Sequence, residues 1–124
     1  MSGTVLVAVT DIFFYTKVRD ALRPQGYTLE RIRSQEQVAE TLASTQPDAM
    51  ILNMNDLVID AFAALHTVRT SSLTPGLPVL AFANHEEVDT WNRAKELGVT
   101  KIVSRNEFSA RTKELVEEIT RIAS

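Results

Sequence analysis

Cysteine is absent from this sequence, and glycine and proline are scarce, at four residues each. Without cysteine the chain forms no disulfide framework, offers no thiolate nucleophile and binds no metal through cysteine sulfur, a composition that suits a reducing compartment. The first residues lead directly into a short apolar run, without the basic flank and longer apolar stretch of a signal peptide. No run approaches the length of a membrane span, so we expect a cytoplasmic protein with no membrane partner.

An excess of charge of one sign is also missing. The 13 Lys and Arg residues nearly balance the 16 Asp and Glu residues, which leaves a formal net charge of −3 with no basic cluster. A protein that binds a phosphate backbone normally concentrates basic residues on one surface, so we expect no nucleic-acid partner. The four glycines are scattered, and none forms a glycine-rich turn after the first apolar run. We therefore expect no dinucleotide and no other cofactor.

What the sequence does contain is a regular alternation of short apolar runs and longer amphipathic stretches. The apolar runs, which predict strands, cover residues 5–9, 27–32, 49–52, 79–82 and 102–103. The amphipathic stretches between them predict helices, with Val58 in the third, Val88 in the fourth and Ser109 as the cap of the fifth. This order predicts one α/β domain over residues 1–124, with a parallel sheet covered by helices on both faces.

The predicted topology also locates a site. Five-stranded sheets of this kind commonly have the strand order 2-1-3-4-5, with a crevice at the carboxyl ends of strands 1 and 3, where the winding reverses. The segments that reach this crevice are residues 9–11, 53–56, 83–85 and 104–106. Any functional site is expected there.

With these elements in place, the whole chain resembles a receiver domain of bacterial two-component response regulators, which has the flavodoxin-like (βα)5 fold of the chemotaxis regulator. The segments that carry the resemblance are Pro47-Asp48, Asp60-Ala61, Leu77-Pro78-Val79, Ala94 and Leu97-Gly98-Val99. Their order and spacing, rather than any one of them, make the resemblance specific.

The positions that would carry phosphorylation in such a receiver have all changed. On the gap-free register they are Val9 and Thr10 for the paired acids, Asn53 for the phosphoacceptor, Ala83 for the inward hydroxyl, Ile102 for the switching aromatic and Arg105 for the lysine. One acid, Asp11, lies one place late, and a one-residue shift would bring it into an acid position. The resemblance therefore implies a degenerate pseudo-receiver.

Elementary chemistry leads to the same expectation. Phosphoryl transfer to a carboxylate needs a nucleophilic oxygen, a divalent cation and a cationic side chain to offset the phosphoryl charge. Magnesium is usually held through one or two carboxylates, whereas Asn53 offers a neutral carbonyl oxygen and Asp11 a carboxylate of uncertain direction. We expect Mg²⁺ binding to be weak or absent, no dedicated metal site and no catalytic residues. Phosphorylation of Asp11 or Asp56 is left as a further alternative.

Arg105 allows two interpretations. Its guanidinium could hold a carboxylate, phosphate or sulfate at the crevice, or it could pair with Asp11 or Asp56 and tie the strand ends together. The two histidines, His66 and His85, have no spacing that would pair them as metal ligands.

Apolar residues outside the expected core indicate a surface for a partner. Phe13 falls off the buried stripe of the first helix and either folds over the crevice or faces a partner. Trp91, Lys95 and Ile102 lie where receivers of this kind use the face formed by helix 4, strand 5 and helix 5 for dimers and targets. Tryptophan is enriched at interface hot spots, so these residues form a second candidate interface, with plain packing of Trp91 as the alternative.

Two functions remain. The favoured one is a stand-alone pseudo-receiver that is not an enzyme and acts in signal transduction by phosphorylation-independent binding to a protein partner or to a second copy. The rival is a small-ligand or anion sensor that uses Arg105, Asn53, Thr10 and Asp11 at the crevice.

Overall fold

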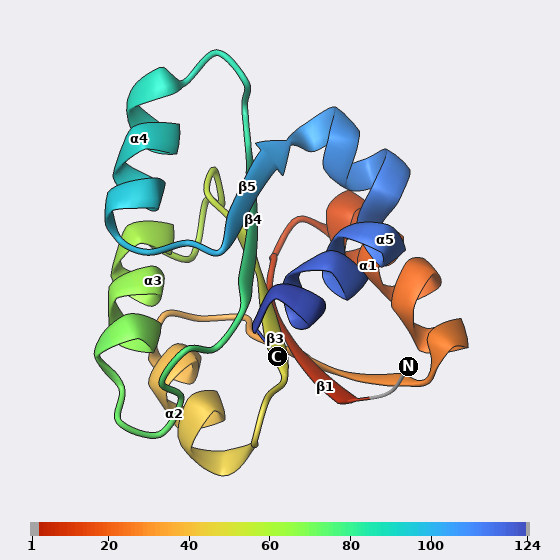
Figure 1. Cartoon of the computed structure of the whole chain (residues 1–124), viewed down its shortest axis with the longest axis vertical. Helices are drawn as coiled ribbons and strands as arrows, with labels where there is room; N and C mark the ends of the chain where they lie inside the picture. Colours follow the sequence, from red (N-terminus) through yellow and green to blue (C-terminus); the bar gives the residue numbers. More distant parts are fainter. Residues whose placement is uncertain (1–2, 124) are drawn as a thin grey trace.

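A computed structural model describes residues 3–123 and contains the predicted parallel sheet (Figure 1). The strands run in the order β2-β1-β3-β4-β5, which confirms the predicted flavodoxin-like topology. Their bounds are β1 Gly3–Ala8, β2 Tyr27–Arg31, β3 Ala49–Asn53, β4 Val79–Ala83 and β5 Lys101–Ser104. The prediction of a single domain over 1–124 also covers residues 1, 2 and 124, which lie outside the described residues.

Helices cover both faces of the sheet, as Figure 1 shows with α2, α3 and α4 on one side and α1 and α5 on the other. Their bounds are α1 Ile12–Leu22, α2 Glu36–Ser44, α3 Ala61–Thr70, α4 Val88–Glu96 and α5 Arg105–Ala123, with a short 3-10 helix at Arg23–Gln25. Within residues 3–123 none of these helices combines the length and apolarity of a membrane span.

The strands alternate their side chains between two cores because successive residues of a strand point to opposite faces. In β3, Met50 and Leu52 pack beneath α2, α3 and α4, whereas Ala49 and Ile51 pack beneath α1 and α5. Strands that are buried on both faces therefore have continuous apolar sequences, and this is why they could be located from the sequence.

Two predicted helix starts need correction, and Val88, which lies in the fourth helix as predicted, is exposed. Helix α3 begins only at Ala61, so Val58 lies in the preceding loop and is exposed. The prediction was wrong because Val58 happens to continue the apolar spacing of the helix. Val88 does begin α4, but it too is exposed rather than packed. Helix α5 begins at Arg105 instead of after Ser109, with the Ser104 Oγ accepting the Glu107 N–H at 3.1 Å.

Candidate functional site

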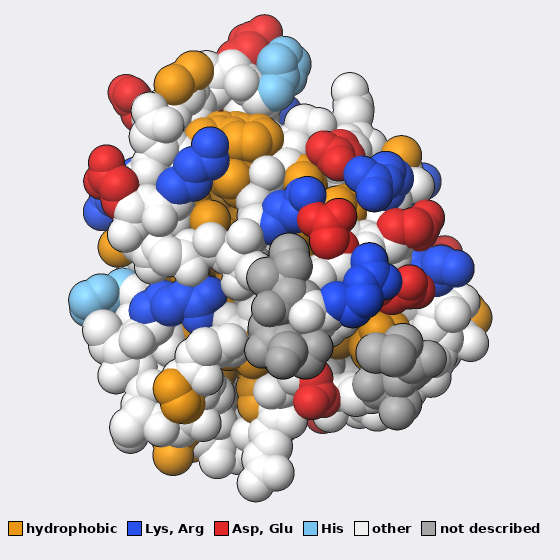
Figure 2. All heavy atoms as spheres, in the orientation of Figure 1, with side chains coloured by type: hydrophobic (Ala, Val, Ile, Leu, Met, Phe, Trp, Pro, Cys, Tyr) orange, Lys and Arg blue, Asp and Glu red, His pale blue; other side chains and the backbone are white. Residues whose placement is uncertain are grey.

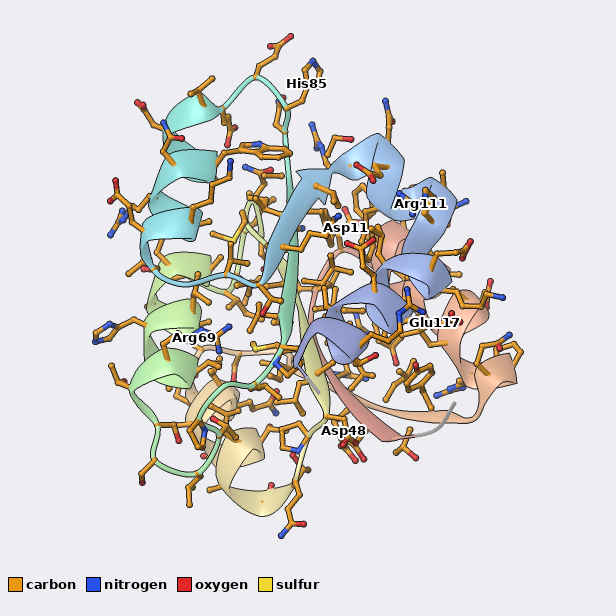
Figure 3. The ribbon with its side chains drawn as sticks, viewed as in Figure 1. Asp11, Asp48, Arg69, His85, Arg111 and Glu117 are labelled. Atoms are coloured by element: carbon orange, nitrogen blue, oxygen red, sulfur yellow. The ribbon has the colours of Figure 1, made fainter. Side chains whose placement is uncertain are left out.

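The carboxyl edge of the sheet gathers the predicted crevice residues. Ala8 of β1 pairs with Leu52 of β3, so the loops that follow these strands leave the sheet side by side. In Figure 3, Asp11 lies near this edge, and Asp48 lies at the opposite end of the sheet. The structure therefore brings residues 9–11 next to residues 53–56, as the predicted topology requires.

The two loops are joined directly through Asp56. Its carboxylate accepts hydrogen bonds from the Thr10 backbone N–H at 2.7 Å and from the Thr10 hydroxyl at 2.8 and 3.0 Å. The same carboxylate accepts the backbone N–H groups of Val58 and Ile59, each at 2.9 Å. Asp56 thus fixes both its own loop and the loop after β1 through hydrogen bonds to protein groups.

These bonds set the charge state of Asp56. Burial acts to raise the pKa of the Asp56 carboxyl, but the hydrogen bonds from Thr10, Ile59 and Val58 outweigh it and hold the pKa below its ordinary value of 3.8. Hydrogen bonds to a carboxylate favour its ionised form. Asp56 is therefore an anion whose acceptor sites are already occupied by the protein.

Asn53 begins a second chain of hydrogen bonds along the same edge. It is only 6% exposed, and its side-chain oxygen accepts the Asn55 N–H at 2.9 Å. The Asn55 amide in turn accepts the Asn84 N–H at 2.9 Å and donates to Glu87 at 2.7 Å. The chain ends where the Trp91 indole N–H donates to the Asn84 carbonyl at 3.0 Å. The loops after β3 and β4 are thereby connected to α4.

The donor set does not suit magnesium. Asp11 is exposed and caps α1, where its carboxylate accepts the Phe14 N–H at 3.2 Å. Asp56 is saturated by protein hydrogen bonds, Asn53 is neutral, and Val9 and Ala83 are buried apolar side chains. Among residues 3–123 no cluster of three or more His, Asp or Glu residues is placed to hold a metal ion. A hard cation would have to take carboxylate oxygens away from these bonds.

Arg105 stands apart from this network. It is exposed at the start of α5, and within residues 3–123 it makes no hydrogen bond or ion pair, so the predicted pairing with Asp11 or Asp56 is wrong. It lines a hollow of about 240 Å³ together with Ser104, Asn106, Asn84, His85 and Glu86. The hollow therefore presents a free guanidinium beside a helix start.

Phe13 is the outer end of an aromatic column. Its ring is 59% exposed and meets the Phe14 ring edge to face at 5.2 Å, with the Lys17 ammonium 5.5 Å from the Phe13 centroid. Phe14 contacts Phe82 at 5.0 Å, and Phe82 stacks on Phe108 at 4.2 Å. Phe13 thus faces solvent on a rigid base and does not fold into the crevice.

The second candidate interface is mostly engaged within the protein. Trp91 is half-buried against the core beneath α4, and its N–H is already bonded to Asn84. Ile102 is 8% exposed and offers almost no surface to a partner, whereas Lys95 is exposed. Figure 2 shows acidic and basic side chains intermingled over the α5 side of this view, with no field of one sign.

One residue of the edge was missed by the sequence reasoning. Arg31, at the end of β2, donates from Nη2 to the Thr10 carbonyl at 3.1 Å, and its guanidinium lies 4.2 Å from the Tyr15 ring centroid. It therefore holds the loop after β1 from the side opposite Asp56. No local pattern signals this role, because it depends on the pairing of β1 with β2.

Comparison with solved structures identifies the class of fold to which this chain is similar. No family model and no curated protein matches the sequence. Solved structures do match over nearly the whole chain. A candidate response regulator from Chloroflexus aurantiacus J-10-fl is 22% identical with a TM-score of 0.87, and the match covers 98% of this chain and 99% of that one. The chemotaxis response regulator CheY4 of Vibrio cholerae is 18% identical with a TM-score of 0.84, over 96% of this chain and 99% of that one.

A third match shows the fold in another setting. The receiver domain of the sensor histidine kinase PA1611 from Pseudomonas aeruginosa PAO1, which holds a magnesium ion in its active-site cleft, is 14% identical with a TM-score of 0.83. That match covers 98% of this chain and 99% of the other. The fold of this chain is thus the CheY-like flavodoxin-like fold, and these structural neighbours are two response regulators and the receiver domain of a sensor histidine kinase.

Proposed function

We propose that the chain is a pseudo-receiver that acts in signal transduction by binding a protein partner, or a second copy, without phosphorylation. The observation that carries the proposal is Asn53, a buried amide at the end of β3 where the receiver resemblance expects the phosphate-accepting carboxylate. An amide oxygen does not form an acyl phosphate at neutral pH, and Asp56, the nearest acid in that loop, has its oxygens occupied by Thr10, Val58 and Ile59.

The same bonds argue for a single resting conformation. Phosphorylation of Asp56 would break its bonds to Thr10, Val58 and Ile59, and phosphorylation of Asp11 would remove the cap of α1. A switch needs two arrangements of similar free energy, each favoured by one state of the ligand. Here the loops after β1, β3 and β4 are joined by hydrogen bonds between protein groups, so we expect the surface they form to be displayed without phosphorylation.

That surface contains four exposed apolar residues, which we call the edge patch: Ile12, Phe13, Leu57 and Val58. Ile12 and Phe13 open α1, and Leu57 and Val58 follow Asp56 in the loop that Thr10 holds. Leu57 is 99% exposed. Thr10 and Asp56 join the segment before α1 to the loop that carries Leu57 and Val58. Several exposed apolar residues in linked segments mark an interaction surface better than a single one does. The edge patch is therefore the proposed contact, in preference to Trp91 and Ile102.

The first test is intact-mass spectrometry of the purified protein after incubation with Mg²⁺ and acetyl phosphate. We expect no added phosphoryl group on the parent protein, and an Asn53→Asp variant tests whether the remaining residues of the edge support the reaction once a carboxylate is present. A phosphoryl group on the parent protein would overturn the proposal.

The second test locates the contact. Partner capture from a cell extract and sedimentation at increasing concentration are each measured for the parent protein, for Phe13→Ser and for Lys95→Ala. We expect Phe13→Ser to lose the interaction and Lys95→Ala to retain it. Loss with Lys95→Ala alone would move the contact to the face of α4 and β5.

A second function is favoured by one specific observation, the free guanidinium of Arg105. The hollow that it lines also contains Ser104 and Asn106 at the start of α5, where the helix dipole attracts anions. An anion sensor would show saturable amide shifts in these residues on titration with sulfate, and Arg105→Ala would abolish them. Shifts that persist in Arg105→Ala would exclude this function.

A further inference from the structure

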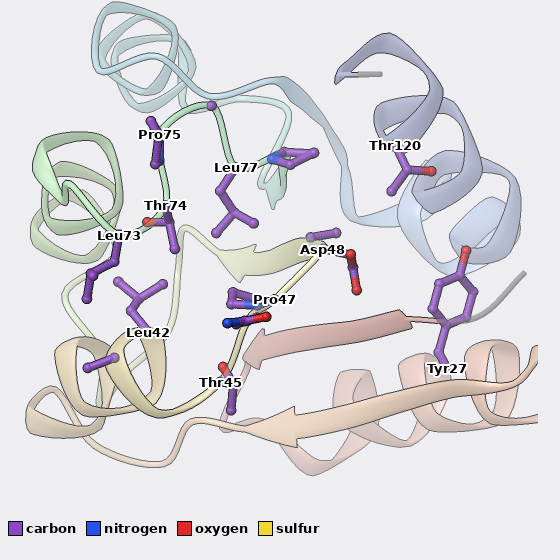
Figure 4. Close-up of a pocket in the computed structure, with 15 residues that line it drawn as sticks. Tyr27, Leu42, Thr45, Pro47, Asp48, Leu73, Thr74, Pro75, Leu77 and Thr120 are labelled. Carbon is purple, nitrogen blue, oxygen red and sulfur yellow. The ribbon is translucent and has the colours of Figure 1, made fainter.

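A groove of about 650 Å³ lies at the amino edge of the sheet, opposite the candidate site. It is formed where the chain enters β2, β3 and β4, between the ends of α2 and α3 and the last turns of α5. Figure 4 shows Leu42, Leu73 and Thr74 at one end and Tyr27, Asp48 and Thr120 at the other. Its volume lies in the range of about 300–1,000 Å³ that is typical of small-molecule sites.

The walls of the groove are poor in backbone hydrogen-bond donors, and the main side-chain donor among the lining residues is the amide of the exposed Gln46. Three of the chain's four prolines, Pro47, Pro75 and Pro78, line it, and proline has no backbone N–H. The hydroxyls of the lining threonines already donate to helix carbonyls, as Thr45 does to Thr41 at 2.7 Å and Thr120 does to Val116 at 3.0 Å. The groove therefore offers apolar surface and acceptors, and it suits a ligand that brings its own donors.

Two acceptors at one end are unused within residues 3–123. Tyr27 is 6% exposed, and its hydroxyl is buried without a hydrogen-bond partner. Asp48 is an exposed residue that accepts the Thr4 N–H through Oδ2 at 2.8 Å, and its Oδ1 has no donor within the described residues. Gly3 permits this approach, because a Cβ at its φ of +134° would lie 2.6 Å from Asp48 Oδ2. Leaving a buried hydroxyl unpaired costs stability unless another molecule completes it.

Two acids, Glu117 and Asp48, lie near the Tyr27 end of the groove. Burial raises the pKa of the Tyr27 hydroxyl, and the nearby charges of Glu117 and Asp48 raise it further, so Tyr27 stays neutral at physiological pH. A carboxylate ligand would be repelled by these two acids, whereas an ammonium group would be attracted.

We propose that this groove binds a small organic cation, an amine or amidine carried on a ring or a short aliphatic body. The cation donates hydrogen bonds to Asp48 Oδ1 and Tyr27 Oη, and its body covers the apolar side chain of Leu77, which lies between the two ends of the groove (Figure 4). The site is independent of the docking function proposed above, because it lies at the other end of the sheet.

The test is an amide-shift titration of the full-length ¹⁵N-labelled protein with benzylamine, benzoate and benzyl alcohol. These probes share a ring and differ in charge. We expect benzylamine to give saturable shifts at Thr74, Gly76 and Leu77, and benzoate to give none. Asp48→Asn should weaken benzylamine binding about tenfold, because a hydrogen-bonded charge pair is lost, and Tyr27→Phe should weaken it about threefold.

A matched control removes one acid elsewhere. Asp89 is an exposed residue of α4 at the carboxyl edge, so Asp89→Asn changes the net charge equally and should leave binding unchanged. Equal responses to benzoate and benzylamine, or an Asp48→Asn variant that binds like the parent, would overturn the proposal. If Asp48→Asn does not fold, Tyr27→Phe and the comparison of probes in the parent protein still decide the question.

Discussion

The two ends of the sheet differ in how many of their polar side chains are hydrogen-bonded within the protein. At the carboxyl edge Asp56 bonds to Thr10 of the loop after β1, and Asn55 bonds to Asn84 of the loop after β4. At the amino edge Tyr27 Oη and Asp48 Oδ1 have no partner within residues 3–123. Open α/β sheets normally bind ligands at the carboxyl edge. In this chain the loops after β1, β3 and β4 are tied together at the carboxyl edge by structural bonds, although within residues 3–123 Arg31 Nε is buried there without a partner and Arg105 is unpaired. The opposite edge holds the larger groove and the unpaired Tyr27 hydroxyl.

The largest effect should come from breaking the bonds of the carboxyl edge. Asp56→Ala removes the acceptor for Thr10, Val58 and Ile59, so we expect the free energy of unfolding to fall by about 3 kcal/mol. Asp60→Ala in the same loop removes a single capping bond to Ala63 and should cost about 1 kcal/mol. Urea unfolding measures both. Equal losses for the two variants would show that Asp56 does not hold the edge together.

A smaller loss of unfolding free energy is expected when Arg69, which holds one wall of the groove, is replaced. Arg69 donates to the carbonyls of Gly98 and Leu77, each at 2.7 Å, and Leu77 lines the groove. Arg69→Ala should lower the free energy of unfolding by about 2 kcal/mol, since two carbonyls lose charged donors. The control is Arg93→Ala, which loses only a contact 4.2 Å above the Phe62 ring and should cost less than about 1 kcal/mol.

Lowering the pH should reduce the stabilisation that Asp56 gives to the carboxyl edge. Because the pKa of Asp56 is lowered on folding, its ionisation stabilises the protein above the unfolded-state pKa, and this stabilisation is lost as the pH falls through the folded-state pKa. The gap in unfolding free energy between the parent protein and Asp56→Asn should therefore shrink as the pH falls from about 5 through the folded-state pKa of Asp56, which lies below 3.8. A gap that stays constant over this range would contradict the lowered pKa.

The smallest effect should come from Tyr27→Phe. Removing a buried hydroxyl that has no partner should leave the free energy of unfolding unchanged or raise it by up to about 1 kcal/mol. Thermal unfolding in the absence of any amine measures it. A loss of more than about 1 kcal/mol would mean that the hydroxyl is hydrogen-bonded in solution, and the two edges would then be alike.

The fold could be predicted from the sequence because its signals are local. Strands such as Ala49–Asn53 are buried on both faces and remain apolar at every position but the last. The helix starts were less accurate, since Val58 continues the apolar spacing of α3 from outside the helix. Spacing alone does not separate a loop residue from a helical one that lies a turn further on.

The candidate site could be located but not described. Strand order placed Thr10, Asn53 and Asp56 at one edge, yet the pairing of Thr10 with Asp56 spans 46 positions of the chain. Arg31 and Tyr27 owe their roles to tertiary neighbours in the same way. Residue type and spacing do not predict which acceptor a distant donor will bind. The absence of a partner for the Tyr27 hydroxyl can be recognised only when the positions of all its neighbours are known.

Trp91 gives the molecule an optical reporter of its own. It is the chain's only tryptophan, and its indole N–H is bonded to Asn84, whose own N–H is bonded to Asn55. The emission of this single fluorophore should therefore follow the hydration of the loops after β3 and β4, without any label. Binding in the groove at the other end of the sheet should leave the emission unchanged, so one spectrum distinguishes events at the two edges.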